Sequence, residues 1–194
     1  MRVAVLLIVL GVIAALGSGW PASSSSTDTA SRPVHVPHRE RRSPLGVAGG
    51  AVPSGTSVFD DEIPGVARLD ADLLAALRRA ATEAAANGVR FTVDSGWRSP
   101  AYQEQLLQQA VSKYGSEAEA ARWVATPQTS AHVKGEAVDL GSSGATWLSA
   151  HGAAYGLCRV YGNEPWHYEL RTEAVDHGCP PVYADPTHDP RMQQ

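Results

Sequence analysis

The segment SAHVKGEAVDLG, residues 130–141, joins a candidate metal ligand to the pattern of a short buried strand. His132 stands seven positions before Asp139, and Gly135 between them lets the chain reverse direction. The letters EAVDL are typical of a buried strand, which would return Asp139 to the neighbourhood of His132. Taken alone, the segment is also compatible with an ordinary corner between two pieces of core.

A second segment, NEPWHYEL at residues 163–170, adds Glu164 and His167. Zinc in a catalytic site takes three protein ligands, commonly histidine and carboxylate, and keeps a fourth position open for water. His132, Asp139 and His167 would satisfy that requirement. Glu164 lies three residues before His167, where its carboxylate could face the open position and accept a proton without ligating. Each residue alone is a weak signal, and only their coincidence favours a metal site.

The apolar pattern around these segments indicates an α+β domain, with a small, mainly antiparallel sheet and helices packed on one side. A helix is predicted after the N-cap Asp70, with Leu69, Leu73, Leu77, Ala80 and Ala84 on its buried face and Gly88 at its end. Two further helices are expected to begin at Ser99-Pro100 and at Ser116, and a fourth to end at Gly156. Strands are predicted at 89–93 and 136–140, and near a sheet edge at 157–162 and 166–171.

Three blocks of the sequence resemble the ordered blocks of the VanY-like D-alanyl-D-alanine carboxypeptidases, which are zinc peptidases of the hedgehog/D-Ala-D-Ala peptidase fold. The blocks are SGWRSPAYQEQLL, SAHVKGEAVDLG and YGLCRVYGNEPWHYEL. The resemblance implies that His132, Asp139 and His167 bind Zn2+ and that Glu164 is the catalytic base. It also implies that Arg98 steadies the oxyanion or the substrate carbonyl and that Ser130 lies beside the substrate. Gln103 falls at a family position too, but a glutamine on a helix surface explains it equally well, so it is left outside the expected site.

The resemblance implies an exported zinc peptidase that cleaves peptidoglycan stem peptides, first of all a D-Ala-D-Ala carboxypeptidase. The alternatives are an endopeptidase of the same fold, a zinc-stabilised cell-wall binding module without turnover, and a surface protein whose histidines are incidental. Glu164 favours catalysis, because a binding module has no need of a carboxylate there. Family members often carry a longer, glycine-bearing hairpin where this chain has only LCRVYGN, so one wall of the substrate groove should differ.

Composition sets the remaining expectations. The 194 residues suffice for one domain, and the formal charge of −4 gives no basic field for nucleic acid. Residues 1–22 have the pattern of a signal peptide or an uncleaved membrane anchor, so the protein should be secreted or extracytoplasmic. We expect a disordered linker at 23–58, a zinc peptidase domain at 59–180, a loose tail at 181–194 and a monomeric protein.

The chain has two cysteines, Cys158 and Cys179. In an exported protein an even pair is most simply a disulfide. The rival interpretation, two thiolate metal ligands, would need partners at finger-like spacing, and the sequence has none.

Overall fold

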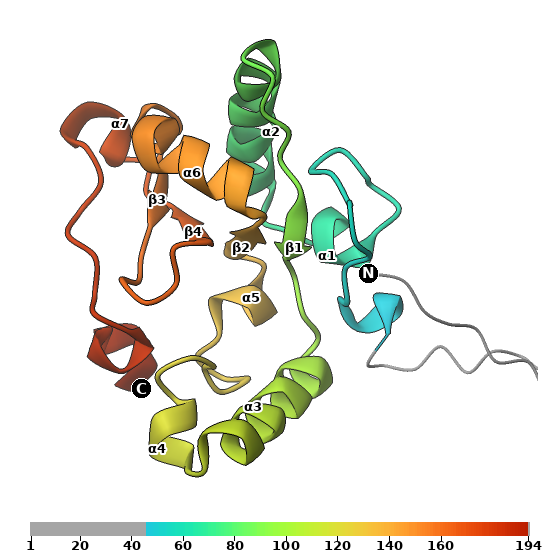
Figure 1. Ribbon diagram of the computed structural model, residues 1–194, viewed down its shortest axis with the longest axis vertical. Helices are drawn as coiled ribbons and strands as arrows, with labels where there is room; N and C mark the ends of the chain where they lie inside the picture. The colour runs from blue at the N-terminus through green and yellow to red at the C-terminus, as the bar shows by residue number, and fades with distance from the viewer. Residues whose placement is uncertain (1–45, 194) are drawn as a thin grey trace, which may run out of the picture. The chain divides into compact units, whose positions relative to one another are not determined.

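The computed structural model describes residues 46–193, whose centre is a four-stranded antiparallel sheet (Figure 1). The strands are β1 (Val93–Ser95), β2 (Ala137–Leu140), β3 (Leu157–Arg159) and β4 (His167–Leu170), in the order β1-β2-β4-β3. The predicted signal or anchor at 1–22, and the linker as far as residue 45, lie outside the described residues. Within residues 46–193, no helix is both long and apolar enough to cross a membrane.

The two faces of the sheet have different roles. In the register of β2 with β4, Val138 lies opposite Tyr168 and Asp139 lies opposite His167. Because successive side chains of a strand point to opposite faces, the first pair shares one face and the second pair shares the other. Val138 and Tyr168 belong to the hydrophobic core, so the face of Asp139 and His167 is left for polar chemistry.

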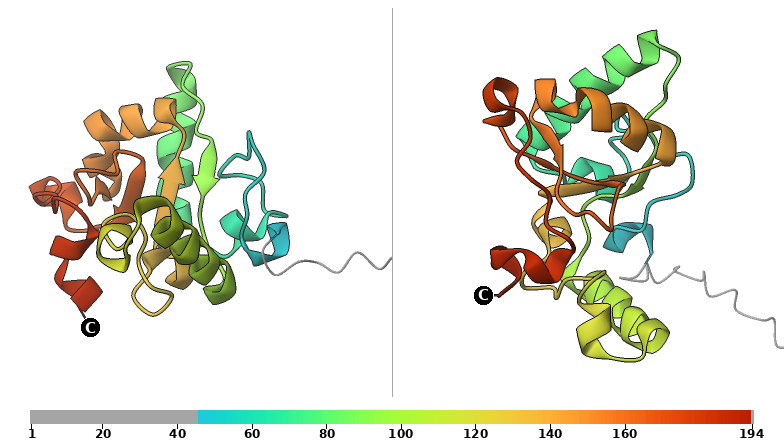
Figure 2. Two further views of the ribbon diagram at one scale, coloured as in Figure 1. Left: turned by 60° about the horizontal axis from the view of Figure 1, so that its bottom comes forward. Right: turned by 60° about the vertical axis from the view of Figure 1, so that its left-hand side comes forward.

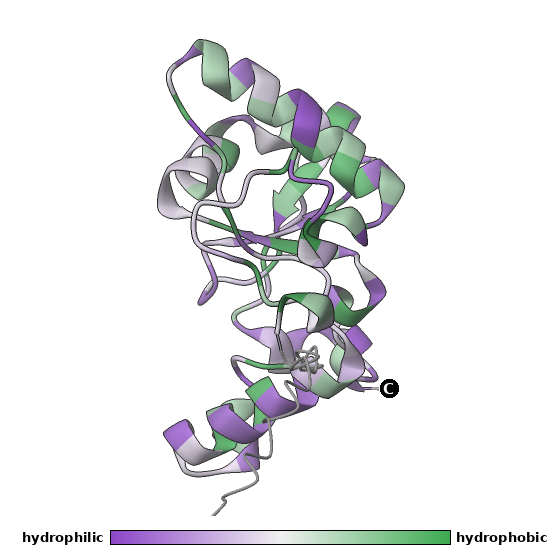
Figure 3. Cartoon of the chain, turned by 90° about the vertical axis from the view of Figure 1, so that its right-hand side faces the viewer, coloured by the Kyte–Doolittle hydropathy of each residue, from purple (hydrophilic) through white to green (hydrophobic). Residues whose placement is uncertain are grey.

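Helices α2 (Ala71–Ala86) and α6 (Ser142–His151) contribute the other half of this core. Their buried side chains cluster with those of the sheet, and the hydroxyl of Tyr168 donates to the carbonyl oxygen of Ala145 in α6 at 2.7 Å. Figure 3 shows that the helices carry both apolar and polar residues, as expected when only one face of each is buried. The predicted α+β fold, with helices covering one side of the sheet, is confirmed for these two helices.

Helix α2 follows its sequence pattern closely. The carboxylate of Asp70 accepts hydrogen bonds from the backbone nitrogens of Asp72 and Leu73, as an N-cap should. The predicted apolar face is buried along its whole length, and Gly88 takes a left-handed conformation just after the helix ends. Two further helices, α3 (Pro100–Tyr114) and the single-turn α4 (Glu117–Ala120), stand at the opposite end of the molecule from α2 (Figures 1 and 2).

The remaining elements are short. They are the helices α1 (Pro64–Ala67), α5 (Ala131–Lys134) and α7 (Ala174–His177), and the 3-10 turns η1 (Val47–Gly49), η2 (Gly152–Tyr155), η3 (Pro186–His188) and η4 (Pro190–Gln193). Cys158 in β3 and Cys179 after α7 form a disulfide, which confirms the predicted bridge.

One strand prediction needs correction. The alternation of Val89, Phe91 and Val93 is correct, but the paired strand β1 begins only at Val93 and continues to Ser95. Strand β3 is an edge strand of the sheet and β4 is its neighbour, as expected for two strands near a sheet edge. Burial alternation shows which side chains face the core, but it does not show which backbone groups find a partner strand.

The folded unit extends beyond both predicted boundaries. In the segment expected to be a linker, Val58 is fully buried and the carbonyl oxygen of Gly49 accepts a hydrogen bond from the backbone of Ser99. In the segment expected to be a loose tail, Asp185 and Asp189 are buried. These segments have no helical or strand periodicity, and polar contacts and backbone hydrogen bonds hold them in place.

Candidate active site

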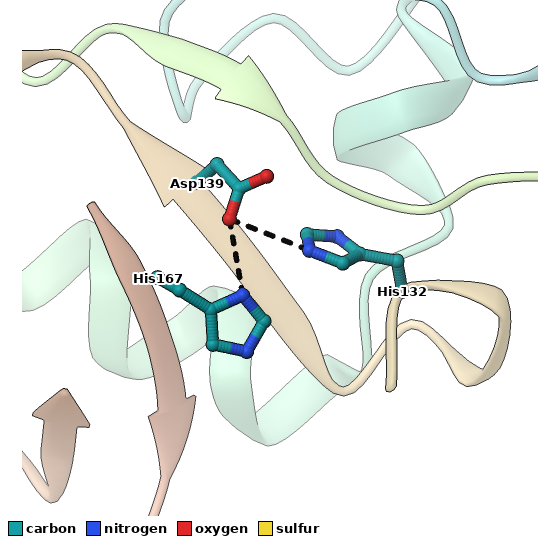
Figure 4. A group of neighbouring side chains, drawn as sticks. All are labelled: His132, Asp139 and His167. Atoms are coloured by element: carbon teal, nitrogen blue, oxygen red, sulfur yellow. Dashed lines mark hydrogen bonds and ion pairs between the residues drawn. The ribbon is translucent and has the colours of Figure 1, made fainter. Parts of the chain in front are cut away.

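His132, Asp139 and His167 come together on the polar face of the sheet (Figure 4). One oxygen of Asp139, Oδ1, lies 3.4 Å from Nε2 of His132 and 3.1 Å from Nδ1 of His167. One ligand atom from each of the three residues lies within 4.8 Å of the other two, and all three residues are buried. Two imidazole nitrogens and a carboxylate oxygen around one point form a donor set suited to a divalent metal such as zinc.

Local chain geometry brings these residues together. His132 lies in α5, and Gly135 ends that helix with a φ of 80°, in the left-handed region that favours glycine. A Cβ at Gly135 would stand 2.6 Å from the carbonyl oxygen of Arg68, so no larger residue fits without a shift. The chain then enters β2, where the register with β4 sets Asp139 directly beside His167.

Hydrogen bonds behind the two rings fix which nitrogen faces the metal position. Nδ1 of His132 lies 2.8 Å from the carbonyl oxygen of Gly96, which can only accept, so this nitrogen carries the hydrogen and Nε2 is left with its lone pair. Nε2 of His167 lies 3.2 Å from the carboxylate of Glu169, which leaves Nδ1 facing Asp139. Such outer partners orient metal-binding histidines and raise their basicity.

The charges of the site are strongly coupled. Burial lowers the pKa of His132, and the nearby Arg98 charge adds to this, so His132 is ready to offer a lone pair. Burial would also lower the pKa of His167, but hydrogen bonds to Asp139 and Glu169 outweigh it and raise that pKa to about 9. A metal ion at Nδ1 would therefore replace the proton that Nδ1 shares with Asp139 in its absence.

Arg98 follows β1 and reaches into the site. Its Nη2 donates to Oδ2 of Asp139 at 2.8 Å, its Nε to Ser95 at 2.7 Å, and its Nη1 to Oε1 of Gln103 at 3.1 Å. The bond to Oδ2 turns the other oxygen of Asp139 toward the two histidines. The observed contact of Arg98 is thus with a candidate metal ligand.

The interpretation of Gln103 as a surface residue of a helix is wrong. Its side chain is 1% exposed, accepts from Arg98, and donates from Nε2 to the carbonyl oxygen of Ala125 at 2.8 Å. Gln103 lies in the first turn of α3, which faces the site. Gln103 shares one helical face with Leu106, Leu107 and Ala110, so a periodic signal of its inward orientation existed and sequence reasoning did not use it.

Glu164 lies beside the cluster and is 7% exposed. Its Oε2 is 3.7 Å from Nδ1 of His167, and its Oε1 is buried without a hydrogen-bond partner among the described residues. A buried polar atom without a partner is uncommon in folded proteins and points to a ligand position. Burial raises the pKa of Glu164 to about 7, so the carboxyl group can exchange a proton near neutral pH.

A cavity of about 370 Å³ opens onto this cluster. Ser130 is buried in its wall, while Trp166, 40% exposed, forms part of its rim. Further walls come from α3, from residues 123–125 and from the carboxyl-terminal segment. The six residues expected in the site all line one cavity: Arg98, Ser130, His132, Asp139, Glu164 and His167.

Glu169 and Arg191 belong to the surroundings of His167, and sequence reasoning did not include them. A signal existed for Glu169, because a residue two positions after a ligand on a strand faces the same side. Arg191 gave no such signal, because its contact with Glu169 spans 22 positions of the chain.

Comparison with known proteins places this site in a family. The profile of the VanY family, described as D-alanyl-D-alanine carboxypeptidase, matches residues 66–172. A D-alanyl-D-alanine carboxypeptidase of Enterococcus faecalis (strain ATCC 700802 / V583) is 29% identical over 143 residues, which cover 60% of this chain and 53% of the relative. The chain thus spans about half the length of this curated relative.

Solved structures similar to this one include two carboxypeptidase structures. VanYB in complex with D-alanine-D-alanine is 29% identical with a TM-score of 0.52, over 57% of this chain and 74% of that one. The LdcB LD-carboxypeptidase has a TM-score of 0.52 over 66% of this chain and 71% of that one, and at 22% identity its likeness concerns the fold alone. The profile match covers more than half of the chain and includes all the expected site residues. The chain therefore belongs to the VanY family of D-alanyl-D-alanine carboxypeptidases.

Proposed function

We propose that this protein is a zinc-dependent D-alanyl-D-alanine carboxypeptidase that removes the terminal D-alanine from peptidoglycan stem peptides. The main support for this function is the arrangement of the candidate ligands around Glu164. Two histidine nitrogens and one oxygen of Asp139 converge on a point beside Glu164, a buried carboxyl group whose pKa lies near neutrality. Membership of the VanY family and a relative whose structure holds D-alanine-D-alanine support the choice of substrate.

The donor set fits zinc, because zinc favours imidazole and carboxylate ligands and needs three of them in a catalytic site. His132, Asp139 and His167 would hold the ion. When bound, zinc supplies a Lewis acid that polarises the scissile carbonyl and makes water more acidic. No protein side chain other than these three is required to hold it.

Glu164 moves the proton in this proposal. Its unpartnered Oε1 accepts a proton from the attacking water and later delivers it to the nitrogen of the leaving D-alanine. A carboxyl group with a pKa near 7 suits both steps, since neither the acid nor the base form is strongly disfavoured at neutral pH.

Arg98 and Ser130 would act on the substrate. A guanidinium has five N–H groups, and three of those on Arg98 donate to Ser95, Gln103 and Asp139. The other two have no partner among residues 46–193 and would be available to an oxygen of the peptide, and the bonds to the protein would keep them aimed. Ser130, in the cavity wall, would lie beside the bound peptide.

The reaction would take place outside the cytoplasm, where peptidoglycan lies. Residues 1–22 would direct export, either as a cleaved signal or as a membrane anchor, and the enzyme would work as a monomer. The exported chain with its disulfide intact is therefore the form to assay.

The test is to incubate the zinc-loaded protein with three defined peptides and to read the products by mass. The peptides are a pentapeptide stem ending in D-Ala-D-Ala, the tetrapeptide that lacks the last residue, and a cross-linked pair of stems. We expect loss of one alanine from the pentapeptide and none from the tetrapeptide. Cleavage inside the stem or the cross-link would instead identify an endopeptidase, and zinc binding without any product would identify a binding module. The Glu164→Gln variant is the matched control.

A further inference from the structure

The carboxyl-terminal segment, residues 183–193, returns to the sheet behind the candidate metal ligands. In Figures 1 and 2 it runs from the side of α7 to the end of the molecule where α3 and α4 lie. The segment falls outside the region matched by the family profile, which ends at residue 172.

Glu169 is the point where the segment meets the site. It lies two residues after His167 in β4, on the same face, and is 1% exposed. Its Oε1 is 3.2 Å from Nε2 of His167, while its Oε2 accepts from Arg171 and from Arg191, each at 2.7 Å. Nη2 of Arg191 also reaches Oε1 at 3.2 Å, so the guanidinium binds both carboxylate oxygens.

Arg191 is itself held firmly. Its backbone nitrogen donates to Oδ1 of Asp189 at 2.9 Å, and its Nε lies 3.1 Å from Oδ1 and 3.0 Å from Oδ2. Asp189 is fully buried and accepts a third group, the hydroxyl of Tyr161, at 3.0 Å. The ring of Tyr161 lies 5.2 Å from the ring of His167, between centroids. The contacts thus run from His167 through Glu169, Arg191, Asp189 and Tyr161 and return to the ring of His167.

We propose that Glu169 and Arg191 are positioning residues for His167, and that the carboxyl-terminal segment is part of the metal-binding unit. Glu169 accepts the hydrogen on Nε2 of His167, which keeps the lone pair of Nδ1 aimed at the metal position. Arg191 holds both oxygens of Glu169 and supplies the positive charge that a buried carboxylate needs. The inference rests on the proposed metal site, but not on the identity of the peptide that is cut.

The same segment has a second attachment that does not touch Glu169. Nε of Arg122 donates to Oδ2 of Asp185 at 3.0 Å. A change at Arg122 therefore loosens the segment without disturbing the partners of His167. It provides the matched control that separates positioning from simple docking of the segment.

The experiment compares Arg191→Ala, Arg191→Lys, Glu169→Gln and Arg122→Ala in the full chain. Zinc affinity is measured by competition with a chromophoric chelator, and the geometry of the site by the visible spectrum of the cobalt(II)-substituted protein. Turnover of the pentapeptide is measured separately. Zinc affinity does not depend on any peptide, so the positioning roles of Glu169 and Arg191 can be tested even if the carboxypeptidase assay shows no product.

We expect Arg191→Ala and Glu169→Gln to weaken zinc binding by about 10–100-fold and to change the cobalt spectrum, as loss of an outer partner of a ligand does. Where turnover is seen, kcat should fall with little change in KM. Arg191→Lys should recover part of the affinity, because it restores the charge but not the two-pronged contact. Arg122→Ala should bind zinc like the parent.

Two results would overturn the inference. One is parental zinc affinity and an unchanged cobalt spectrum in Arg191→Ala, with only the melting temperature lowered. The other is equal loss of zinc affinity in Arg122→Ala and Arg191→Ala, which would make docking of the segment the cause. If Arg191→Ala does not fold, Arg191→Lys and Glu169→Gln decide between these outcomes.

Discussion

Replacing Glu164 with glutamine separates proton transfer from metal binding. The amide has the size of the carboxylate but cannot take a proton from water. Oε2 of Glu164 is 3.7 Å from His167, too far for a hydrogen bond, and Oε1 has no partner among residues 46–193, so the substitution breaks no bond that holds the fold. We expect normal zinc content and a fall in kcat of about 10²–10⁴-fold, the usual share of a positioned acid or base.

The pH dependence of stability gives this prediction a second readout. Burial raises the pKa of Glu164 from 4.5 to about 7 in the folded protein. The unfolded chain therefore loses this proton first as the pH rises, so the metal-free fold loses stability between about pH 4.5 and pH 7, by on the order of 3 kcal/mol in total, and stays at that lower stability above pH 7. Metal-free Glu164→Gln should be more stable than the parent at pH 8, and the difference should disappear near pH 4.

Asp139→Ala is the contrasting variant. It removes the oxygen that faces both histidines and leaves Arg98 without its buried partner, so zinc affinity and melting temperature should fall together. The assay measures zinc content, thermal melting and turnover of the pentapeptide on both variants side by side. If Glu164→Gln loses zinc as readily as Asp139→Ala, Glu164 is a ligand; if it cleaves at the parental rate, the base is another group.

Three further outcomes are expected. Replacing Cys158 and Cys179 with serine should lower the free energy of unfolding by about 3 kcal/mol, from closure of a loop with a separation of 21 residues, and an unchanged denaturation midpoint would contradict this. Gly135→Ala should reduce both stability and zinc content, because the φ of 80° and the nearby carbonyl of Arg68 exclude a Cβ; parental values of both would refute the argument. Burial would raise the pKa of Asp185, but its hydrogen bonds lower it from 3.8 to about 2, so its stabilisation is present above pH 4 and is lost as the pH falls through 2. Asp185→Asn should therefore cost about 2 kcal/mol in denaturation at pH 7 and little at pH 2, whereas an equal cost at both would exclude an ionic contribution.

The parts of the fold that could be predicted are those with a strong local signal. Asp70 caps α2 because its carboxylate reaches free backbone nitrogens, and Leu73 and Leu77 recur at helical spacing on the buried face. The candidate metal ligands could be predicted for a related reason. Gly135 marks a reversal, and the alternation in β2 and β4 sends Asp139 and His167 to one face.

Other features depend on contacts between distant segments. Arg191 contacts Glu169 only because the chain after Cys179 returns to the sheet. That segment has no apolar periodicity from which this return could be predicted. Gln103 faces inward on the same helical face as Leu106, Leu107 and Ala110, but its polar side chain finds its partners, Arg98 and the carbonyl oxygen of Ala125, only in the folded chain. The family pattern predicted that Arg98 acts at the site, but its bond to Asp139 could be seen only in the folded chain.

The dependence of peptidase activity on one metal ion is the most direct test of a three-ligand zinc site. Zinc is removed with a strong chelator and dialysis, then returned in measured steps while pentapeptide cleavage is followed in the same samples. Because one ligand atom from each of His132, Asp139 and His167 lies within 4.8 Å of the others, we predict that activity disappears without metal and is fully restored by one zinc per chain. Full activity of the metal-free protein would contradict it, as would an endpoint that requires two zinc ions.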